Sequence, residues 1–400
     1  MRYPCKTVQL VAFIALLSAG PAFTQTPSPE INTNTTSAPS AYVYVQTSKG
    51  VNLYDAAANG QLTLVKGSPF KTVGLMIGSN GKHFITLGTD YIHSYAVAAS
   101  GAIGEQASTI DTQDFAGNEC GPTNGAALDH TGQNLYVRIG TGGPDESSGC
   151  FALQSYMIEK SSGAFSFLGV ADNHDSDSYT QPTLAANDVL AHAVNFDAQT
   201  PPKVIGFKRG FNGGLDTLNI HVTEPTPEPG GWVYYPWLAV SDPTNHLAVA
   251  VFPQQMAPDG TMGPDQLASY TVASNGNVSS TNTWKNMPTP DICLDTLNMA
   301  PSGKFLAAAS SVSICDNNSA GNTGLQIFHF NGANPLTPLG KAITTAPINS
   351  IRWDSNNHLY ATSESSNKLY VYTVTSTTIT EAPGSPYSIS SPSSLVVVPK

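Results

Sequence analysis

Short runs of apolar residues recur along the chain, separated by turns rich in Gly, Asn, Asp and Pro. An apolar strand, a turn and a second strand appear together six times, beginning at Leu75, Ala126, Leu184, Leu238, Leu297 and Ile351. A third strand that ends in an aromatic residue appears seven times, at Tyr54, Tyr95, Tyr156, Phe207, Tyr270, Phe328 and Tyr372. A Gly- or Asn-bearing turn and a fourth strand follow. This pattern is typical of antiparallel hairpins.

The two ends of the chain carry complementary parts of one repeat. The first repeat starts at Ala41 with what is the second strand elsewhere, and residues 394–400 match the first strand of the Leu297 repeat. Repeats of four strands in radial array form a β-propeller, whose blades protect one another's edges. We predict an all-β fold over 41–400: a seven-bladed β-propeller of four-stranded antiparallel blades, closed by the C-terminal strand joining the N-terminal blade. A linear solenoid or two sandwiches would not explain complementary ends.

The first 24 residues predict a secretory signal peptide. Arg2 and Lys6 precede an apolar run at 8–17 that is too short to span a membrane, and small residues follow it. Residues 25–40 are rich in Thr, Ser and Pro, which predicts a linker. We therefore expect a secreted or periplasmic protein without a membrane span.

The charge balance excludes some functions. The chain has 17 Lys and Arg against 28 Asp and Glu, a formal net charge of -11. A nucleic-acid binder needs a basic face to neutralise phosphates, so we expect no nucleic-acid partner. Few cations also argue against a phosphorylated substrate, whose charge would need Arg or Lys partners.

Four cysteines follow the signal peptide. Cys120 and Cys150 flank the first two strands of the Ala126 repeat, and Cys293 and Cys315 hold the same slots in the Leu297 repeat. Both slots lie on one propeller face, so we predict two disulfides, Cys120–Cys150 and Cys293–Cys315. Each would stabilise the fold by about 3 to 4 kcal/mol through loop entropy. The alternative is a zinc site or a reactive thiol, and no CxxC spacing supports zinc.

Several short motifs resemble the lactonase-type seven-bladed propellers, a family that includes the propeller form of 6-phosphogluconolactonase. They are GSPF at 67–70, GSPY at 384–387, PSGKFL at 301–306, LGTDYIHSY at 87–95 and the Tyr-ending third strands. The resemblance covers 41–400 and implies the propeller fold and hydrolysis of a lactone. The family's Gly-Pro-Arg-His and His-rich segments are absent from this sequence, so no catalytic residue is carried over.

Propeller ligands usually bind at the mouth of the central channel, lined by the connectors that enter the first strands. In these connectors we interpret Asp291 or Asp295 as the group that activates water and Arg352 as the group that stabilises an oxyanion. Candidate ligand-binding residues, whose aromatic rings and amides suit a sugar-like ring, are Trp232, Tyr234, Tyr235, Trp237, Asn124, Gln181 and Asn349. The alternative is that the tryptophans pack between blades and the carboxylates are solvated at the rim.

We expect no metal and no cofactor. The segment DNHDSD at 172–177 could hold Ca2+ through Asp172, Asp175 and Asp177, but it lacks the register and the Gly of a calcium loop, which favours a solvated loop. Four histidines share a repeat slot directly after the inner turn: His83, His192, His246 and His358. A metal site or a pH switch is the alternative, but residues on separate blades stand too far apart to share one ion, so we interpret the slot as a repeat-consensus position beside the turn.

Two functions remain open on the sequence. The first is an exported lactonase-like hydrolase that opens a cyclic ester at the channel mouth. The second is a non-enzymatic extracytoplasmic propeller that binds a protein or a polysaccharide. The expected partner is a small-molecule lactone or glycan, or an extracellular protein, and we expect a monomer. No Gly-x-Ser-x-Gly or HExxH motif decides between the two functions.

Overall fold

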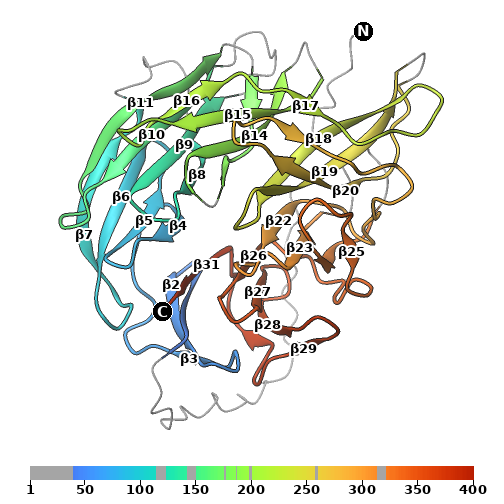
Figure 1. Ribbon diagram of the computed structural model, residues 1–400. Helices are drawn as coiled ribbons and strands as arrows, with labels where there is room; N and C mark the ends of the chain where they lie inside the picture. The colour runs from blue at the N-terminus through green and yellow to red at the C-terminus, as the bar shows by residue number, and fades with distance from the viewer. Residues whose placement is uncertain are drawn as a thin grey trace, which may run out of the picture. The chain divides into compact units, whose positions relative to one another are not determined.

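The computed structural model describes residues 39–113, 123–141, 150–174, 177–185, 187–197, 201–256, 260–312 and 321–400. Within these ranges the secondary structure consists of β-strands, which form seven separate sheets. The sheets follow one another in chain order around a ring (Figure 1). The described residues include no helix long and apolar enough to cross a membrane. The predicted signal peptide at 1–24 and most of the predicted linker lie outside the described residues.

The first three sheets, which we call blades 1 to 3, have four strands each. Blade 1 contains β31 (Ser394–Pro399), β1 (Ala41–Thr47), β2 (Gly50–Ala56) and β3 (Leu62–Leu64). Blade 2 contains β4 (Leu75–Ser79), β5 (His83–Leu87), β6 (Tyr91–Val97) and β7 (Ile103–Asp111). Blade 3 contains β8 (Thr123–Leu128), β9 (Asn134–Thr141), β10 (Cys150–Ile158) and β11 (Phe165–His174).

Three of the remaining four blades have a short fifth strand, which the sequence repeat did not predict. Blade 4 contains β12 (Asp177–Tyr179), β13 (Thr183–Leu184), β14 (Leu190–Asp197), β15 (Lys203–Arg209) and β16 (Leu215–Leu218). Blade 5 contains β18 (Trp232–Ser241), β19 (His246–Gln255), β20 (Gln266–Val272), β21 (Val278–Ser279) and β17 (Val222–Thr223). Blade 6 contains β22 (Thr296–Met299), β23 (Phe305–Ser310), β24 (Gly324–His329) and β25 (Thr337–Pro338). Blade 7 contains β26 (Ser350–Trp353), β27 (His358–Ser363), β28 (Lys368–Val374), β29 (Ile379–Glu381) and β30 (Tyr387–Ser388).

The C-terminal strand closes the ring as predicted. β31 pairs antiparallel with β1, from Ala41 opposite Pro399 to Gln46 opposite Ser394. The Gln46 side chain reinforces the closure because its Nε2 donates to the Gly74 carbonyl of the next blade at 3.0 Å, while its Oε1 accepts from Ser394 Oγ at 3.1 Å. The seven-bladed propeller is therefore confirmed, including the joining of its two ends.

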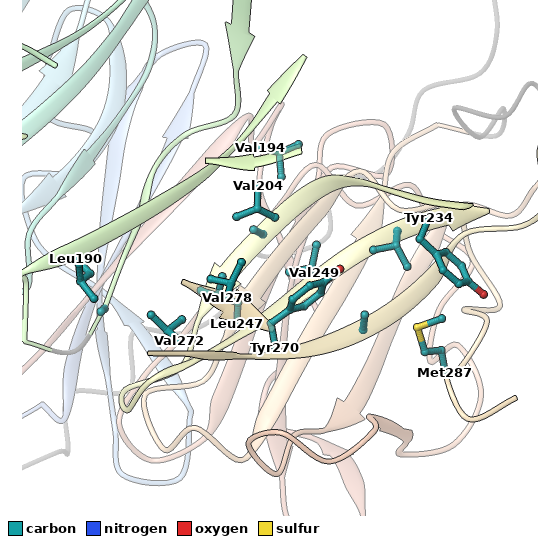
Figure 2. Packing of buried hydrophobic residues seen from close by; sticks show 14 residues of the cluster. Leu190, Val194, Val204, Tyr234, Leu247, Val249, Tyr270, Val272, Val278 and Met287 are labelled. Atoms are coloured by element: carbon teal, nitrogen blue, oxygen red, sulfur yellow. The ribbon is translucent and has the colours of Figure 1, made fainter. Parts of the chain in front are cut away.

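Apolar side chains fill the spaces between neighbouring sheets. Between blades 4 and 5, Val194 and Val204 face a cluster that includes Val249 and the fully buried Tyr270 (Figure 2). All seven repeat aromatics of the third strands are buried, with exposed fractions of 8% or less. Burying one such side chain contributes roughly 1.5 to 3 kcal/mol, so the aromatic position of the repeat is a core position.

Glycines with positive φ bring neighbouring blades together. Each lies in the hairpin between the third and fourth strands of one blade, where an added Cβ would meet a side chain of the preceding blade. The pairs are Gly60 with His358, Gly101 with Tyr42, Gly163 with His83, Gly213 with Asn134, Gly276 with Leu218 and Gly332 with His246. The repeated histidines therefore pack against the glycine turns of neighbouring blades.

The structure corrects one histidine assignment. His83, His246 and His358 are the first residues of β5, β19 and β27, whereas His192 is the third residue of β14. His192 also contacts the glycine turn of a neighbouring blade, but through a hydrogen bond: its Nε2 donates to the Gly276 carbonyl at 3.0 Å. In blade 4 the carbonyl of Leu190, two positions before His192, accepts the hydrogen bond that the carbonyls of His246 and His358 accept in blades 5 and 7.

We predict that Gly163→Ala destabilises the protein more than Gly81→Ala. Both glycines have positive φ, so either alanine introduces about 1 to 2 kcal/mol of backbone strain. At Gly163 the new Cβ would also lie 2.6 Å from His83 Cδ2, whereas at Gly81 it would meet nothing within 4 Å. Overpacking should add about 1 to 3 kcal/mol. Urea unfolding of both variants measures the difference, and equal losses would contradict the packing role of the glycine.

We also predict that the free energy of unfolding falls as the pH drops below about 6.5. Burial lowers the pKa of His192 although its hydrogen bond to Gly276 opposes the shift, and burial also lowers the pKa of His83. The unfolded chain then binds more protons than the folded one, so stability is complete above the ordinary histidine pKa and is lost as pH falls through the folded value. Thermal unfolding from pH 8 to 5 should show a shallower slope in His192→Gln. The exposed His221→Gln is the control, and a wild-type slope in His192→Gln would refute this origin.

Candidate functional site

The innermost strands of all seven blades surround a cavity of about 570 Å3. Its lining residues come from β4, β8, the segment that enters β13, β18, β22, β26 and β31. They are residues 77–79, 126–128, 180–183, 238–240, 295–298, Arg352 and 396–399. A cavity of this size suits a small molecule. The ring thus surrounds a central space that the innermost strands line.

The depth of each lining residue follows from the strand register. In every blade the residue that directly follows the innermost strand donates its backbone N–H to the carbonyl of a residue at or just before the start of the second strand, which we use as the origin. The origins are Ser40, His83, Asn134, Leu190, His246, Phe305 and His358. The residue two positions further along pairs with one residue of the innermost strand. These seven partners form one layer of the cavity, which we call the Arg352 layer: Val398, Gly78, Ala127, Thr183, Val240, Asn298 and Arg352.

Arg352 places a positive charge in this layer. Its side chain is largely removed from solvent, and its NH1 donates to the Ile351 carbonyl at 2.7 Å. The guanidinium forms no ion pair with any residue that the structure describes. Burial lowers the pKa of Arg352, yet an arginine keeps its proton in proteins. The cavity therefore holds a cation that no described residue neutralises through an ion pair.

Asp295 enters the same cavity nearer the mouth. Its Oδ2 accepts a hydrogen bond from Ser311 Oγ at 2.7 Å, and the residue is exposed. It precedes Asn298 of the Arg352 layer by three positions, which corresponds to about 10 Å along a strand. Asp295 and Arg352 thus line one cavity from neighbouring blades, at different depths.

Asp291 lies away from the cavity lining. Its Oδ1 is 3.1 Å from Lys341 Nζ, and its Oδ2 accepts from Gln326 Nε2 at 3.1 Å and from the Ala342 backbone N–H at 3.3 Å. These contacts tie the connector that enters blade 6 to other parts of the same blade. Of the two predicted carboxylates, the structure brings only Asp295 together with Arg352 in the cavity.

The predicted aromatic cluster divides between two blade interfaces. Tyr234 is 5% exposed, packs between blades 4 and 5, and donates to Gln266 Oε1 at 2.7 Å (Figure 2). Burial raises its pKa to about 12. Trp237 packs between blades 5 and 6, and the Tyr235 ring lies 5.7 Å from that of Phe252. None of these residues, nor the half-buried Trp232, lines the cavity.

The predicted amide residues have different positions. Gln181 is exposed and lines the cavity. Asn349 holds the connector into β31, because its Nδ2 donates to the carbonyls of Pro392 and Ser393 at 3.1 and 2.6 Å while its Oδ1 accepts from the Glu364 N–H. Asn124 belongs to β8, and its side chain lies outside the described part of the structure.

Sequence reasoning missed two polar residues of the Arg352 layer. Asn298 and Thr183 occupy, in their own repeats, the position that Arg352 occupies in blade 7. The Thr183 hydroxyl lies 2.8 Å from Ser241 Oγ, while the Asn298 side chain makes no hydrogen bond with a described residue. Aligning Leu297 with Ile351 places Asn298 at the position of Arg352, whereas the position of Thr183 depends on the register of β13 with β14.

Some predicted features fall on residues that the structure does not describe. Cys120 and Cys315 are among them, so both disulfide pairings stay predictions; Cys293 is 1% exposed. The calcium alternative at 172–177 also includes such residues, among them Asp175. Among the described residues, no group of three or more His, Cys, Asp or Glu side chains is arranged to hold a metal ion.

Solved structures of similar architecture cover nearly the whole chain. A candidate 6-phosphogluconolactonase from Bacteroides fragilis matches over 91% of this chain and 99% of its own, with 14% identity and a TM-score of 0.56. The periplasmic gluconolactonase of Pseudomonas aeruginosa matches over 90% and 99%, with 14% identity and a TM-score of 0.55. A Lactobacillus plantarum protein matches over the same shares at 14% identity and 0.60.

The chain has the fold of the lactonase-type propellers. No family model matches the sequence, and neither does any curated protein. The likeness therefore concerns the arrangement of the blades, which agrees with the architectural motifs found in the sequence. The cavity residues must be interpreted from this propeller's own geometry.

We predict that Arg352→Met leaves the free energy of unfolding unchanged or raises it by up to about 2 kcal/mol. Methionine fills similar space and removes a half-buried charge that forms no ion pair with a described residue. Arg209→Met is the contrasting variant, because Arg209 NH1 lies 3.1 Å from Oδ2 of the fully buried Asp129. Its loss should destabilise by about 1 to 3 kcal/mol, because that carboxylate loses its charged partner while it keeps hydrogen bonds from Thr131 and Asn134. Thermal and urea unfolding test both, and a large loss in Arg352→Met would show that Arg352 has a structural role.

Proposed function

We propose that the protein is an exported, lactonase-like hydrolase that opens a lactone in the central cavity. The observation that carries this proposal is the presence of Arg352, without an ion-pair partner, in the cavity that Asp295 also lines. Hydrolysis of a cyclic ester develops negative charge on the carbonyl oxygen, and a fixed cation in a poorly solvated site stabilises that charge. The predicted signal peptide supports a periplasmic or secreted location, where the neighbour from Pseudomonas aeruginosa also acts.

The two groups divide the reaction between them. The Asp295 carboxylate takes a proton, through a bridging water, from the water molecule whose oxygen attacks the carbonyl carbon of the ring ester. Arg352 stabilises the oxyanion of the tetrahedral intermediate. The bond to the ring oxygen then breaks, and that oxygen takes the proton from Asp295. The product is an open-chain hydroxy acid, whose carboxylate remains complementary to the arginine.

A neutral lactone fits the charges of the site better than a phosphorylated one. Arg352 is the cation among the cavity-lining residues that the structure describes, and Asp295 is near the mouth. A phosphate ester carries about two negative charges and would need further cationic partners. We therefore place the substrate among uncharged lactones of sugar size.

One feature favours the second function, binding of a protein or a polysaccharide outside the cell. The β18–β19 hairpin is long, with ladder pairs from Ser241 opposite Leu247 to Trp232 opposite Gln255. Beyond it, Met256 and Met262 are 67% and 44% exposed. Exposed methionines are frequent at adaptable binding surfaces. If the protein hydrolyses no lactone, binding of a protein or a polysaccharide becomes the better-supported function.

We predict saturable hydrolysis of a neutral lactone that depends on Asp295 and not on Asp291. A pH-indicator assay of the purified protein against neutral and phosphorylated lactones measures the turnover. Asp295→Asn should lower kcat by about 100-fold or more, because it removes the general base. Asp291→Asn is the matched control and should keep nearly full activity, since its exposed contact with Lys341 contributes at most about 1 kcal/mol. Full activity in Asp295→Asn, or equal losses in both variants, would contradict the assignment.

A further inference from the structure

We propose that the central cavity is a binding site for a polyhydroxylated monocarboxylate, whose carboxylate pairs with Arg352. The inference rests on the same site as the proposed function but requires no reaction to occur. It would apply to an open-chain acid that is a product of the enzyme, or to an acid that a non-catalytic propeller captures.

The positive charge of Arg352 in the cavity favours a ligand that carries a carboxylate. Arg352 forms no ion pair with a described residue, and its hydrogen bond to the Ile351 carbonyl uses one of its five N–H donors. The guanidinium fork matches a carboxylate with two parallel hydrogen bonds, which are stronger in a poorly solvated cavity than in water. A bound carboxylate would neutralise a charge that no described residue pairs with.

The neighbouring positions suit hydroxyl groups. In the Arg352 layer, Asn298 of the adjacent blade offers an amide, and Thr183 of blade 4 offers a hydroxyl. The other four residues of the layer are small or apolar: Gly78, Ala127, Val240 and Val398. The ligand should therefore carry its charge on one side and neutral polar groups toward blades 4 and 6.

The mouth of the cavity disfavours a second anionic group. Asp295 lies there, about 10 Å along the strand from the Arg352 layer. A six-carbon dicarboxylate bound at Arg352 would bring its second carboxylate toward this acid, where like charges repel. The cavity of about 570 Å3 has room for a six-carbon chain. The site should thus prefer monoanions over dianions of the same length.

Binding is tested by calorimetry with three matched probes: galactonate, the dicarboxylate galactarate and the neutral polyol galactitol. We expect galactonate to bind the purified protein at least tenfold more tightly than the other two. Arg352→Met should weaken galactonate binding at least tenfold, and Asn298→Ala should weaken it severalfold. Lys82→Met removes an exposed charge from the β4–β5 turn and should bind like the wild type. Circular dichroism of each variant establishes that it is folded.

The outcomes separate this proposal from the proposed function. Galactonate binding that Arg352→Met abolishes and Asp295→Asn retains would support the anion site even if no lactone is hydrolysed. Lactone hydrolysis without galactonate binding or inhibition would overturn the site while leaving the hydrolase. Equal affinity for galactonate and galactitol, or wild-type affinity in Arg352→Met, would also overturn it.

Discussion

The pairing of β1 with β31 is the constraint on which the rest of the structure depends. Each blade buries both faces of its sheet against its neighbours, so a missing contact at one position would expose apolar surface on two blades. The six ladder pairs between the ends of the chain close the ring, and Gln46 links the closed blade to the Gly74 carbonyl of blade 2. The cavity exists because seven innermost strands meet in this way. Its walls are therefore as rigid as the closure itself.

Much of the fold could be predicted from the sequence because every repeat must fill the space between neighbouring sheets with the same kind of side chain. The aromatic that ends each third strand fills the space between two sheets, and all seven are buried as this explanation requires. The complementary ends of the chain likewise predicted that a C-terminal strand, β31, closes the ring. The short fifth strands of blades 4, 5 and 7 carry no such repeated demand. They depend on local pairing that the pattern of apolar residues does not specify.

The candidate site could be predicted only in part, because a segment that the sequence repeat assigns to a connector can form part of a strand in the structure. The sequence predicts that residues 232–237 belong to a connector at the channel mouth, but β18 begins at Trp232 and pairs with β19 along its length. Pairing fixes which side chains turn toward the neighbouring blades, and Tyr234 and Trp237 consequently enter two different cores. Asp295 and Arg352 do line the cavity, because Asp295 directly precedes β22 and Arg352 belongs to β26. Their separation in depth depends on the register, which becomes evident only from the turn-closing hydrogen bonds.

Arg352 occupies a position that folding alone does not explain. The positions equivalent to it in three other blades hold Gly78, Ala127 and Val240, small residues that let the innermost strands approach one another. An arginine there needs more space than these residues and loses hydration that no described carboxylate replaces. Arg352 therefore breaks the pattern of the repeat at the centre of the ring and lowers local stability there. Such exceptions are expected at functional sites, and here a ligand could supply the missing partner of the arginine. The stability of the ring elsewhere, in glycine turns and buried aromatics, is what allows one blade to carry this unpaired charge.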